Sequence, residues 1–261
     1  MRLQSQSFIT NIVTMLLFAL LHGPGLLRNY HSEQGWFSSL TEVNFRRMMS
    51  VRADNRKSHM SSVASHPEKN VIRVQLKQNS VLKNLRDSEM AALEPYLTIV
   101  DCQKGDVLLH QGIYEMEQYF VLDGILKRAV TNQNAKEMIL RFAAEREMET
   151  SYAAWRLKTP TPYSIVSVTK ARVAKMSLPQ WVLFIESHAE VKQTFEYEVM
   201  QLMSEIMAHT ITLHLLNAPG RVHRFVRKHA DLFERLPKKE LASYLNLSPE
   251  TLSRLKNQGK I

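Results

Sequence analysis

The side chains best suited to recognise another molecule lie near the C-terminal end of the sequence. A helix is predicted to begin at Pro249, because Ser248 is a favourable N-cap and proline is favoured at the first helical position. Leu252 and Leu255 are spaced to face one side of this helix. The side chains left on its other face are Glu250, Thr251, Ser253, Arg254 and Asn257.

This outward set has the hydrogen-bonding chemistry needed to contact double-stranded DNA. Arginine can bind guanine through two hydrogen bonds, glutamate can accept one from cytosine, and asparagine and serine can contact base edges. The predicted base-reading residues are Glu250, Arg254, Ser253 and Asn257. Cations and hydroxyl groups supply most contacts to the DNA backbone. The predicted phosphate-contacting residues are Lys238, Lys239, Ser248, Thr251 and Lys256.

A second short helix is predicted immediately before this one. Leu241, Ala242 and Leu245 place apolar groups on one face, and the small Ala242 permits close approach of a neighbouring helix. Asn246 falls at the turn and tolerates a left-handed conformation. Two short helices joined in this way predict a helix-turn-helix. The alternative is a hairpin that only completes a core, but residues 221–261 carry ten basic against four acidic residues, which favours DNA binding.

Upstream of this motif, apolar residues recur at alternating steps of three and four, as in a coiled-coil seam. The seam consists of Phe195, Val199, Leu202, Ile206, Leu213 and Leu216, with His209 at one further position. We expect it to pair with a second copy of the chain and give a homodimer. Packing on a sheet of the same chain is the alternative. Asn217 to Gly220 ends the helix and is predicted to act as a hinge.

The middle of the chain predicts short antiparallel strands. They are expected at residues 97–100, 107–109, 119–122, 125–130, 138–142, 163–168 and 172–176. Asp123-Gly124 predicts a two-residue hairpin of type I′, in which both central residues have positive φ. Thr169-Lys170 is expected to join a last strand pair, and residues 143–157 favour a helix. The predicted fold class is α+β: an antiparallel β-roll of jelly-roll type, a long helix and a small all-α domain.

The N-terminal region lacks this patterning. Phe8–Leu21 is apolar but shorter than the roughly 20 residues of a membrane span, and it resembles the core of a signal peptide. Residues 28–67 are expected to be poorly ordered. Residues 1–59 are either a real extension or sequence that lies upstream of a natural start at Met60. The predicted domains are residues 1–72, an N-terminal extension, 73–185, the β-roll, 186–217, the dimerisation helix, and 218–261, the DNA-binding domain.

Composition narrows the function further. The 261 residues carry a formal net charge of +9, which suits an anionic partner. The single cysteine, Cys102, excludes an intramolecular disulfide and a cysteine-ligated metal cluster within one chain. We therefore expect a cytoplasmic protein with no metal site and no membrane partner. The sequence shows no nucleophile elbow, phosphate loop or metal-ligand spacing, so an enzyme is not expected.

From about Val74 onward the chain resembles the Crp/Fnr family of bacterial transcription regulators. The resemblance rests on Lys104–Leu108 with Gln111-Gly112, on Tyr119–Gly124, and on Ala242 with Ser248–Arg254. It implies a cyclic-nucleotide-binding-type β-roll, a long dimerisation helix and a C-terminal helix-turn-helix. It also implies a homodimer that binds double-stranded DNA and regulates transcription, with RNA polymerase as a candidate partner.

The sequence departs from the family at its effector site. Members that bind cyclic AMP use a Gly-Glu step and a later arginine, whereas this chain has Arg146–Glu149 and no cation in residues 159–164. A buried anion without a charged partner is costly, so cyclic AMP is not the expected effector and no cofactor is predicted. Glu149 and Lys158 are the remaining candidates for an effector pocket.

A second departure concerns DNA recognition. Pro249 stands where the family often has an arginine, and no wing is expected after Ile261. The alternative function is a ligand-sensing β-roll that regulates a partner protein through the C-terminal hairpin. We disfavour it because docking hairpins expose apolar anchors, and the outward face of this one is charged.

Overall fold

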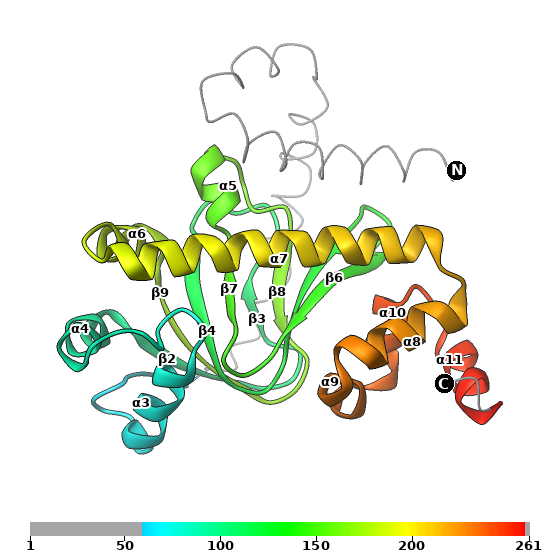
Figure 1. Cartoon of the computed structure of the whole chain (residues 1–261), viewed down its shortest axis with the longest axis horizontal. Helices are drawn as coiled ribbons and strands as arrows, with labels where there is room; N and C mark the ends of the chain where they lie inside the picture. The colour runs from blue at the N-terminus through cyan, green and yellow to red at the C-terminus, as the bar shows by residue number, and fades with distance from the viewer. Residues whose placement is uncertain (1–58, 259–261) are drawn as a thin grey trace, which may run out of the picture. The chain divides into compact units, whose positions relative to one another are not determined.

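The computed structural model of the chain describes residues 59–258 (Figure 1). Most of the predicted N-terminal extension, including Phe8–Leu21, lies outside these residues, as does Lys260. Ala153–Thr159 forms part of one compact unit, and the rest of the described chain belongs to a second one. Apart from Lys158 and the part of helix α5 (Tyr152–Leu157) that follows Tyr152, the residues described below lie in this second unit.

Two antiparallel sheets form the β-roll. The first contains, in order, β1 (His59–Ser62), β2 (Thr98–Cys102), β9 (Ala171–Ser177), β4 (Glu117–Asp123) and β7 (Met148–Thr150). The second contains β3 (Val107–Leu109), β8 (Ser164–Ser167), β5 (Leu126–Thr131) and β6 (Glu137–Ala143). Apolar side chains from both sheets, among them Tyr119 and Val173 from the first and Leu126 and Ile165 from the second, form a common core. The predicted α+β class with an antiparallel roll is confirmed.

The structure corrects how the predicted strands are joined. β4 and β5 lie in different sheets, so Asp123-Gly124 is not a hairpin turn, and only Gly124 has a positive φ, of 82°. β8 and β9 are likewise divided between the sheets. The two connections lie against each other, since the backbone N–H of Val168 donates to the carbonyl of Ile125 at 2.8 Å. Short-range turn signals do not distinguish a hairpin from such a crossover.

A second correction concerns the helix predicted at residues 143–157. The first half of this segment contains β7, which pairs with β4, and only Tyr152–Leu157 is helical, as α5. Met148, Glu149 and Thr150 are all buried. A strand that is buried on both faces has no alternation of polar and apolar residues, which is the reason it was missed.

Order also begins earlier than predicted. β1 pairs with β2, so that Met60 lies opposite Val100. Three short helices follow it: α3 (Lys69–Gln78), α4 (Asp87–Leu93) and the 3-10 helix η2 (Glu94–Tyr96). Ile72 and Leu76, one turn apart on α3, are fully buried. The prediction of poor order is therefore wrong for residues 59–72.

The long helix is α7 (Ala189–Leu215), preceded by α6 (Leu178–Glu186) and running across the strands in Figure 1. Phe195, Val199 and Leu202 from the predicted dimer seam are buried within the single chain, and Phe195 packs edge-to-face on Trp181 at 5.4 Å. This half of the seam serves the chain's own core, which corrects its assignment to a dimer contact. Spacing alone identifies an apolar helix face but not what covers it.

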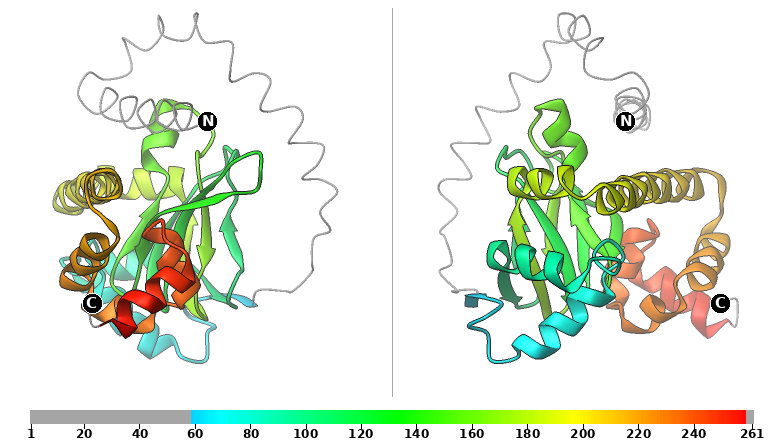
Figure 2. Two further views of the ribbon diagram at one scale, coloured as in Figure 1. Left: turned by 90° about the vertical axis from the view of Figure 1, so that its right-hand side faces the viewer. Right: turned by 60° about the vertical axis from the view of Figure 1, so that its left-hand side comes forward.

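Four helices complete the chain: α8 (Ala218–Lys228), α9 (Ala230–Arg235), α10 (Lys238–Tyr244) and α11 (Pro249–Asn257). Figure 2 shows them beside the roll. Their apolar faces share one core with the second sheet, in which Val222, Leu241 and Leu255 join Ile139 and Phe142. The C-terminal domain is thus packed on the roll through side chains that neither part would bury alone.

Gly124 provides a test of the crossover. A Cβ at this position would lie 2.2 Å from the carbonyl oxygen of Lys170 and 2.7 Å from the Cα of Ala171. Gly105 has a similar φ, of 90°, but a Cβ there would meet nothing within 4 Å. We expect Gly124→Ala to lower the free energy of unfolding by about 2–4 kcal/mol and Gly105→Ala by about 1 kcal/mol, as measured by urea denaturation. Equal losses would contradict the close approach of the two connections.

Candidate nucleic-acid interface and the interior of the roll

The C-terminal motif has the predicted helix-turn-helix geometry. α10 and α11 are joined by a short turn in which Asn246 has a left-handed φ of 52°. The backbone N–H of Leu247 donates to the carbonyl of Ala242 at 2.9 Å, and Ala242 itself is fully buried. Leu252 and Leu255 pack into the shared core. The hydrophobic framework of the motif therefore follows the sequence prediction.

The start of α11 is capped as expected. The Ser248 hydroxyl accepts a hydrogen bond from the backbone N–H of Thr251 at 3.1 Å, and Pro249 occupies the first turn. A hydrogen bond that the Glu250 carboxylate accepts from its own backbone N–H holds its pKa below the ordinary value. Glu250 is therefore charged at neutral pH and can only accept hydrogen bonds, as a contact to cytosine requires.

The outward face of α11 is open to solvent. Glu250, Arg254 and Asn257 are exposed, Ser253 is half-buried, and together they line a shallow hollow. Among residues 59–258, no hydrogen bond or ion pair engages the side chain of Arg254. The structure thus brings the four predicted base-reading residues onto one surface.

The predicted phosphate-contacting residues lie on α10, on α11 and at the cap between these helices. Lys238 and Lys239 lie exposed at the start of α10, and Lys256 is exposed on α11. Ser248 is exposed, and the half-buried Thr251 accepts a hydrogen bond from its hydroxyl at 3.2 Å. The two hydroxyl groups form part of the helix cap, and the three lysines supply the positive charge.

Two ion-pair groups attach this domain to the roll. Glu240 on α10 accepts a hydrogen bond from Lys127 at 2.9 Å, and the same ammonium group donates to Glu137 at 2.7 Å. Arg235 at the end of α9 binds the carboxylate of Glu145 at 2.8 Å. Lys127 is only 7% exposed, so its pair is shielded from solvent screening.

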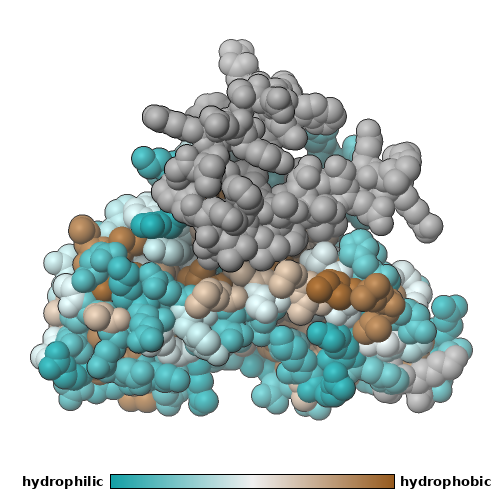
Figure 3. All heavy atoms as spheres, turned by 45° about the horizontal axis from the view of Figure 1, so that its top comes forward, coloured by the Kyte–Doolittle hydropathy of each residue, from teal (hydrophilic) through white to brown (hydrophobic). Residues whose placement is uncertain are grey.

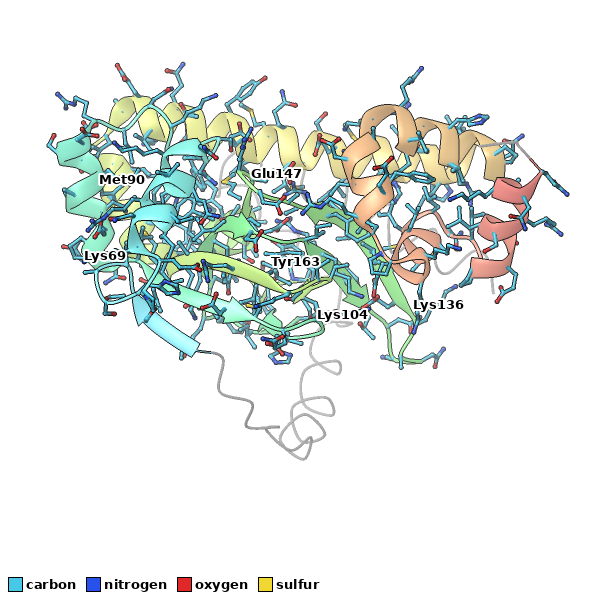
Figure 4. The ribbon with its side chains drawn as sticks, turned by 90° about the horizontal axis from the view of Figure 1, so that it is seen from below. Lys69, Met90, Lys104, Lys136, Glu147 and Tyr163 are labelled. Atoms are coloured by element: carbon cyan, nitrogen blue, oxygen red, sulfur yellow. The ribbon has the colours of Figure 1, made fainter. Side chains whose placement is uncertain are left out.

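An ionic cluster lies inside the roll. The fully buried carboxylate of Glu149 accepts hydrogen bonds from the Nε of Arg128 at 2.9 Å and from the Nη1 of Arg141 at 2.7 Å. The guanidinium of Arg128 also lies 4.1 Å from the ring centre of Tyr163, which is labelled among the strands in Figure 4. The Tyr163 hydroxyl donates to the carbonyl of Thr150 at 2.8 Å. Glu149, Arg128, Arg141 and Tyr163 are thus each held by another group of the chain.

Neither arginine of this cluster was predicted from the sequence. The expected cation lay in residues 159–164 or at Lys158, whereas the cations come from strands β5 and β6. The sequence does contain a signal for Arg128. It lies two residues from each of the core residues Leu126 and Val130 and therefore on the same face of the strand, where a charge needs a buried partner. Lys158, the other predicted pocket residue, has a left-handed φ of 55° after α5 and belongs to the separate unit.

Other kinds of site were also sought within residues 59–258. No cluster of three or more His, Cys, Asp or Glu side chains in this part of the chain could hold a metal ion. None of the helices described combines the length and the apolar character that crossing a membrane requires. The charged face of α11 and the interior of the roll therefore remain the principal candidates.

Several solved structures share the fold. FixK2 from Bradyrhizobium japonicum has a TM-score of 0.53 and 16% identity, covering 62% of this chain and 86% of that protein. The c-di-GMP-responsive global regulator CLP from Xanthomonas campestris has a TM-score of 0.53 and 15% identity, with coverages of 67% and 92%. A CooA mutant from Carboxydothermus hydrogenoformans has a TM-score of 0.53 and 13% identity, with coverages of 64% and 77%.

No protein-family model and no curated protein sequence matches the chain. At identities this low, the likeness to solved structures concerns the fold. The fold is the one that the Crp/Fnr resemblance implied.

Glu149 provides a test of the buried cluster. We expect Glu149→Gln to lower the free energy of unfolding by about 3–5 kcal/mol, because it leaves two buried guanidinium groups without a compensating charge. Asp87→Asn, which breaks the exposed pair with Lys77, should cost less than about 1 kcal/mol. Urea denaturation of the three proteins measures both effects, and similar values for the two variants would show that the cluster is not shielded from water.

Proposed function

We propose that the protein is a transcription regulator of the Crp/Fnr type that binds double-stranded DNA through α11. The observation that carries this proposal is the capped helix that presents Glu250, Arg254 and Asn257 to solvent while Leu252 and Leu255 hold its other face in the core. A helix inserted into the major groove needs such a division between a fixed face and a reading face.

The surroundings of α11 support the same function. Lys238, Lys239 and Lys256 place three exposed cations beside the reading face, and Ser248 and Thr251 add hydroxyl groups at its N-terminal end. The positive end of a helix and nearby ammonium groups both favour phosphate oxygens. In this proposal these five residues set the position of α11 on the DNA backbone and the four outward residues read the bases.

The proposal includes a homodimer, formed by a different face of α7 from the one that the sequence predicted. Tyr197, Met200, Ile211 and Leu215 are each about half-exposed or more, at 54%, 52%, 49% and 77%, and lie on the side of the helix opposite the buried seam. Figure 3 shows hydrophobic side chains in separate groups toward the left and the right of the face it displays. Two copies joined there would bring two recognition helices to successive major grooves, about 34 Å apart.

The interior of the roll supports a regulator that does not use cyclic AMP. Glu149, the residue expected to meet a ribose hydroxyl, is fully buried and already accepts hydrogen bonds from Arg128 and Arg141. A nucleotide would have to displace these bonds and supply an equivalent negative charge to the two guanidinium groups. We therefore propose that the cluster stabilises the roll, and that any effector bound at Glu149 requires the cluster to open.

Arg254 provides the test of base reading. We expect Arg254→Ala to weaken binding to the preferred DNA site by about 1–3 kcal/mol and to relax base preference at one position, because a bidentate contact to guanine is lost. The measurement is fluorescence anisotropy with a site selected from genomic fragments, compared with random DNA of equal length. An unchanged ratio of specific to random affinity would contradict the reading role of Arg254.

Lys239→Ala is the matched control, since it also removes one exposed cation from the domain. We expect it to weaken specific and random DNA alike and to lower the salt dependence of binding by about one charge. A changed base preference in this variant would contradict its phosphate role. If the wild-type protein bound no genomic fragment, a partner-regulating roll would become the better hypothesis.

Ile211 provides the test of the dimer face. Ile211→Glu would place a charge in an apolar contact, so we expect the dimer dissociation constant to rise at least about tenfold in sedimentation equilibrium. Val74→Glu makes the same chemical change at an exposed position on α3, where 56% of the side chain is exposed, and should leave dimerisation unchanged. A monomeric wild-type protein, or equal effects of the two variants, would contradict this interface.

A further inference from the structure

A cleft lies where α7, α8, α10 and strand β6 meet. The charged and histidine side chains that line it are Arg141, Glu205, His209, Arg221, Arg224, Lys228 and His229. We call it the hinge cleft, because the short connection Leu216-Asn217 joins α7 to α8 beside it. Ala218–Gly220, which the sequence placed in this hinge, form the first turn of α8 instead. Its volume is about 40 Å³. Since a water molecule needs roughly 10–15 Å³ measured in this way, the cleft has room for a small group of about three such molecules.

Positive charge exceeds negative charge in this lining. The carboxylate in the lining belongs to Glu205. Lys228 donates a hydrogen bond to it at 2.9 Å, so the charges of these two side chains balance. Arg221 donates to the neutral carbonyls of Leu216 at 2.9 Å and Leu245 at 3.2 Å, which satisfies hydrogen bonds but leaves its charge uncompensated.

Arg224 adds a second uncompensated charge. Within residues 59–258, neither a hydrogen bond nor an ion pair engages its side chain. Two guanidinium groups that face one cleft create a local positive potential, and such a potential favours a bound anion.

Two buried nitrogen atoms of the lining have no hydrogen-bond partner among the described residues. One is the Nε of Arg141, whose side chain is almost fully buried, with 7% of the residue exposed. The Nη atoms of this arginine donate to Glu147 and Glu149, whereas its Nε–H has no acceptor among the described residues. The other is the Nε2 of His209. Buried polar atoms in proteins are nearly always hydrogen-bonded, so two such nitrogens in one cleft indicate a site for a polar ligand.

The setting of His209 makes it sensitive to an anion. Its ring stacks on Tyr244 at a centroid distance of 3.7 Å and an interplanar angle of 4°. Burial is the main cause that lowers the pKa of His209 to about 4. Repulsion from His229, Arg221 and Arg224 contributes to this lowering, and a hydrogen bond with the backbone of Tyr244 opposes it. An anion in the cleft would cancel part of the repulsion and favour the protonated ring, whose Nε2 then becomes a donor.

We propose that the hinge cleft binds one phosphate-sized tetrahedral oxyanion through Arg221, Arg224, the Nε–H of Arg141 and the ring of His209. A tetrahedral oxyanion presents acceptors in several directions, which suits donors that arrive from α8, β6 and α7, whereas a carboxylate presents them in one plane. The oxyanion is either a free ion or the terminal group of a phosphomonoester. Its binding would join the roll, the long helix and the DNA-binding domain through one ligand.

The test compares Arg224→Gln with Arg227→Gln. Both variants remove one exposed arginine from α8, but Arg227 does not line the cleft. Isothermal titration with sodium sulfate and with inorganic phosphate, at ionic strength matched with sodium chloride, should show one saturable site per chain in the wild-type protein and in Arg227→Gln. We expect at least tenfold weaker binding in Arg224→Gln. Equal affinities in the two variants, or no saturable binding to the wild-type protein, would overturn the proposal.

The pH dependence tests the part of His209. Sulfate keeps its charge between pH 8 and pH 5, so a change in its affinity reports on the protein. We expect sulfate to bind more tightly as pH falls, because binding favours protonated His209, and we expect His209→Gln to remove this increase. The other titratable and charged groups facing His209 are Arg141, Glu205, Arg221, Arg224, Lys228, His229 and Tyr244.

Of these groups, His229 is the other histidine, and burial holds its pKa below the ordinary value as well, so His229→Gln is the control. If the affinity did not depend on pH, or if only His229→Gln removed the dependence, the role of His209 would be overturned.

A final comparison identifies the source of the oxyanion. Glycerol 3-phosphate that bound more tightly than inorganic phosphate would indicate a phosphomonoester, and weaker binding would indicate the free ion. None of these titrations contains DNA. Their failure would therefore leave the proposed DNA-binding function untouched, and a failure to bind DNA would leave the anion site standing.

Discussion

The packing of Tyr244 determines how the C-terminal domain is placed on the roll. Its ring lies 5.1 Å from that of Phe142 on β6 and 5.5 Å from that of Phe225 on α8, and it stacks on His209 of α7. One aromatic side chain thus contacts the roll, the long helix and the first helix of its own domain. Because α10 carries Tyr244, this contact also sets the position of α11, which packs on α10. The reading face of α11 depends on an interaction that involves none of its own residues.

Charge is distributed differently in the three parts of the chain. Inside the roll, Glu149 compensates Arg128 and Arg141 by direct hydrogen bonds, and burial makes this balance obligatory. On α11 and at the start of α10 the cations are exposed and without such partners, as contact with a polyanion requires. In the hinge cleft, Arg221 and Arg224 are intermediate, since they face a partly enclosed space with too few acidic groups. The same residue type is therefore structural in one place and available for binding in another.

The candidate site could be predicted from the sequence to the extent that it depends on neighbours along the chain. The cap at Ser248, the left-handed Asn246 and the division of α11 into a buried and an outward face all follow from residues a few positions apart. The cluster around Glu149 could not be found in this way, because its arginines lie 21 and 8 residues away on other strands. The hinge cleft is harder still to predict from the sequence, since its residues come from several separate elements.

The sequence by itself determined the α+β class, the long helix and the helix-turn-helix, because helix periodicity, capping and turn chemistry act over short distances. Only the tertiary structure decided which partners these elements meet. Gly124 and Thr169-Lys170 look like hairpin turns but join two sheets, and Phe195 and Val199 form a helix seam that faces the chain's own core. The physical reason is that an apolar face gains free energy from burial against any apolar surface. Local spacing therefore defines the face, and the packing of the whole chain selects the surface that covers it.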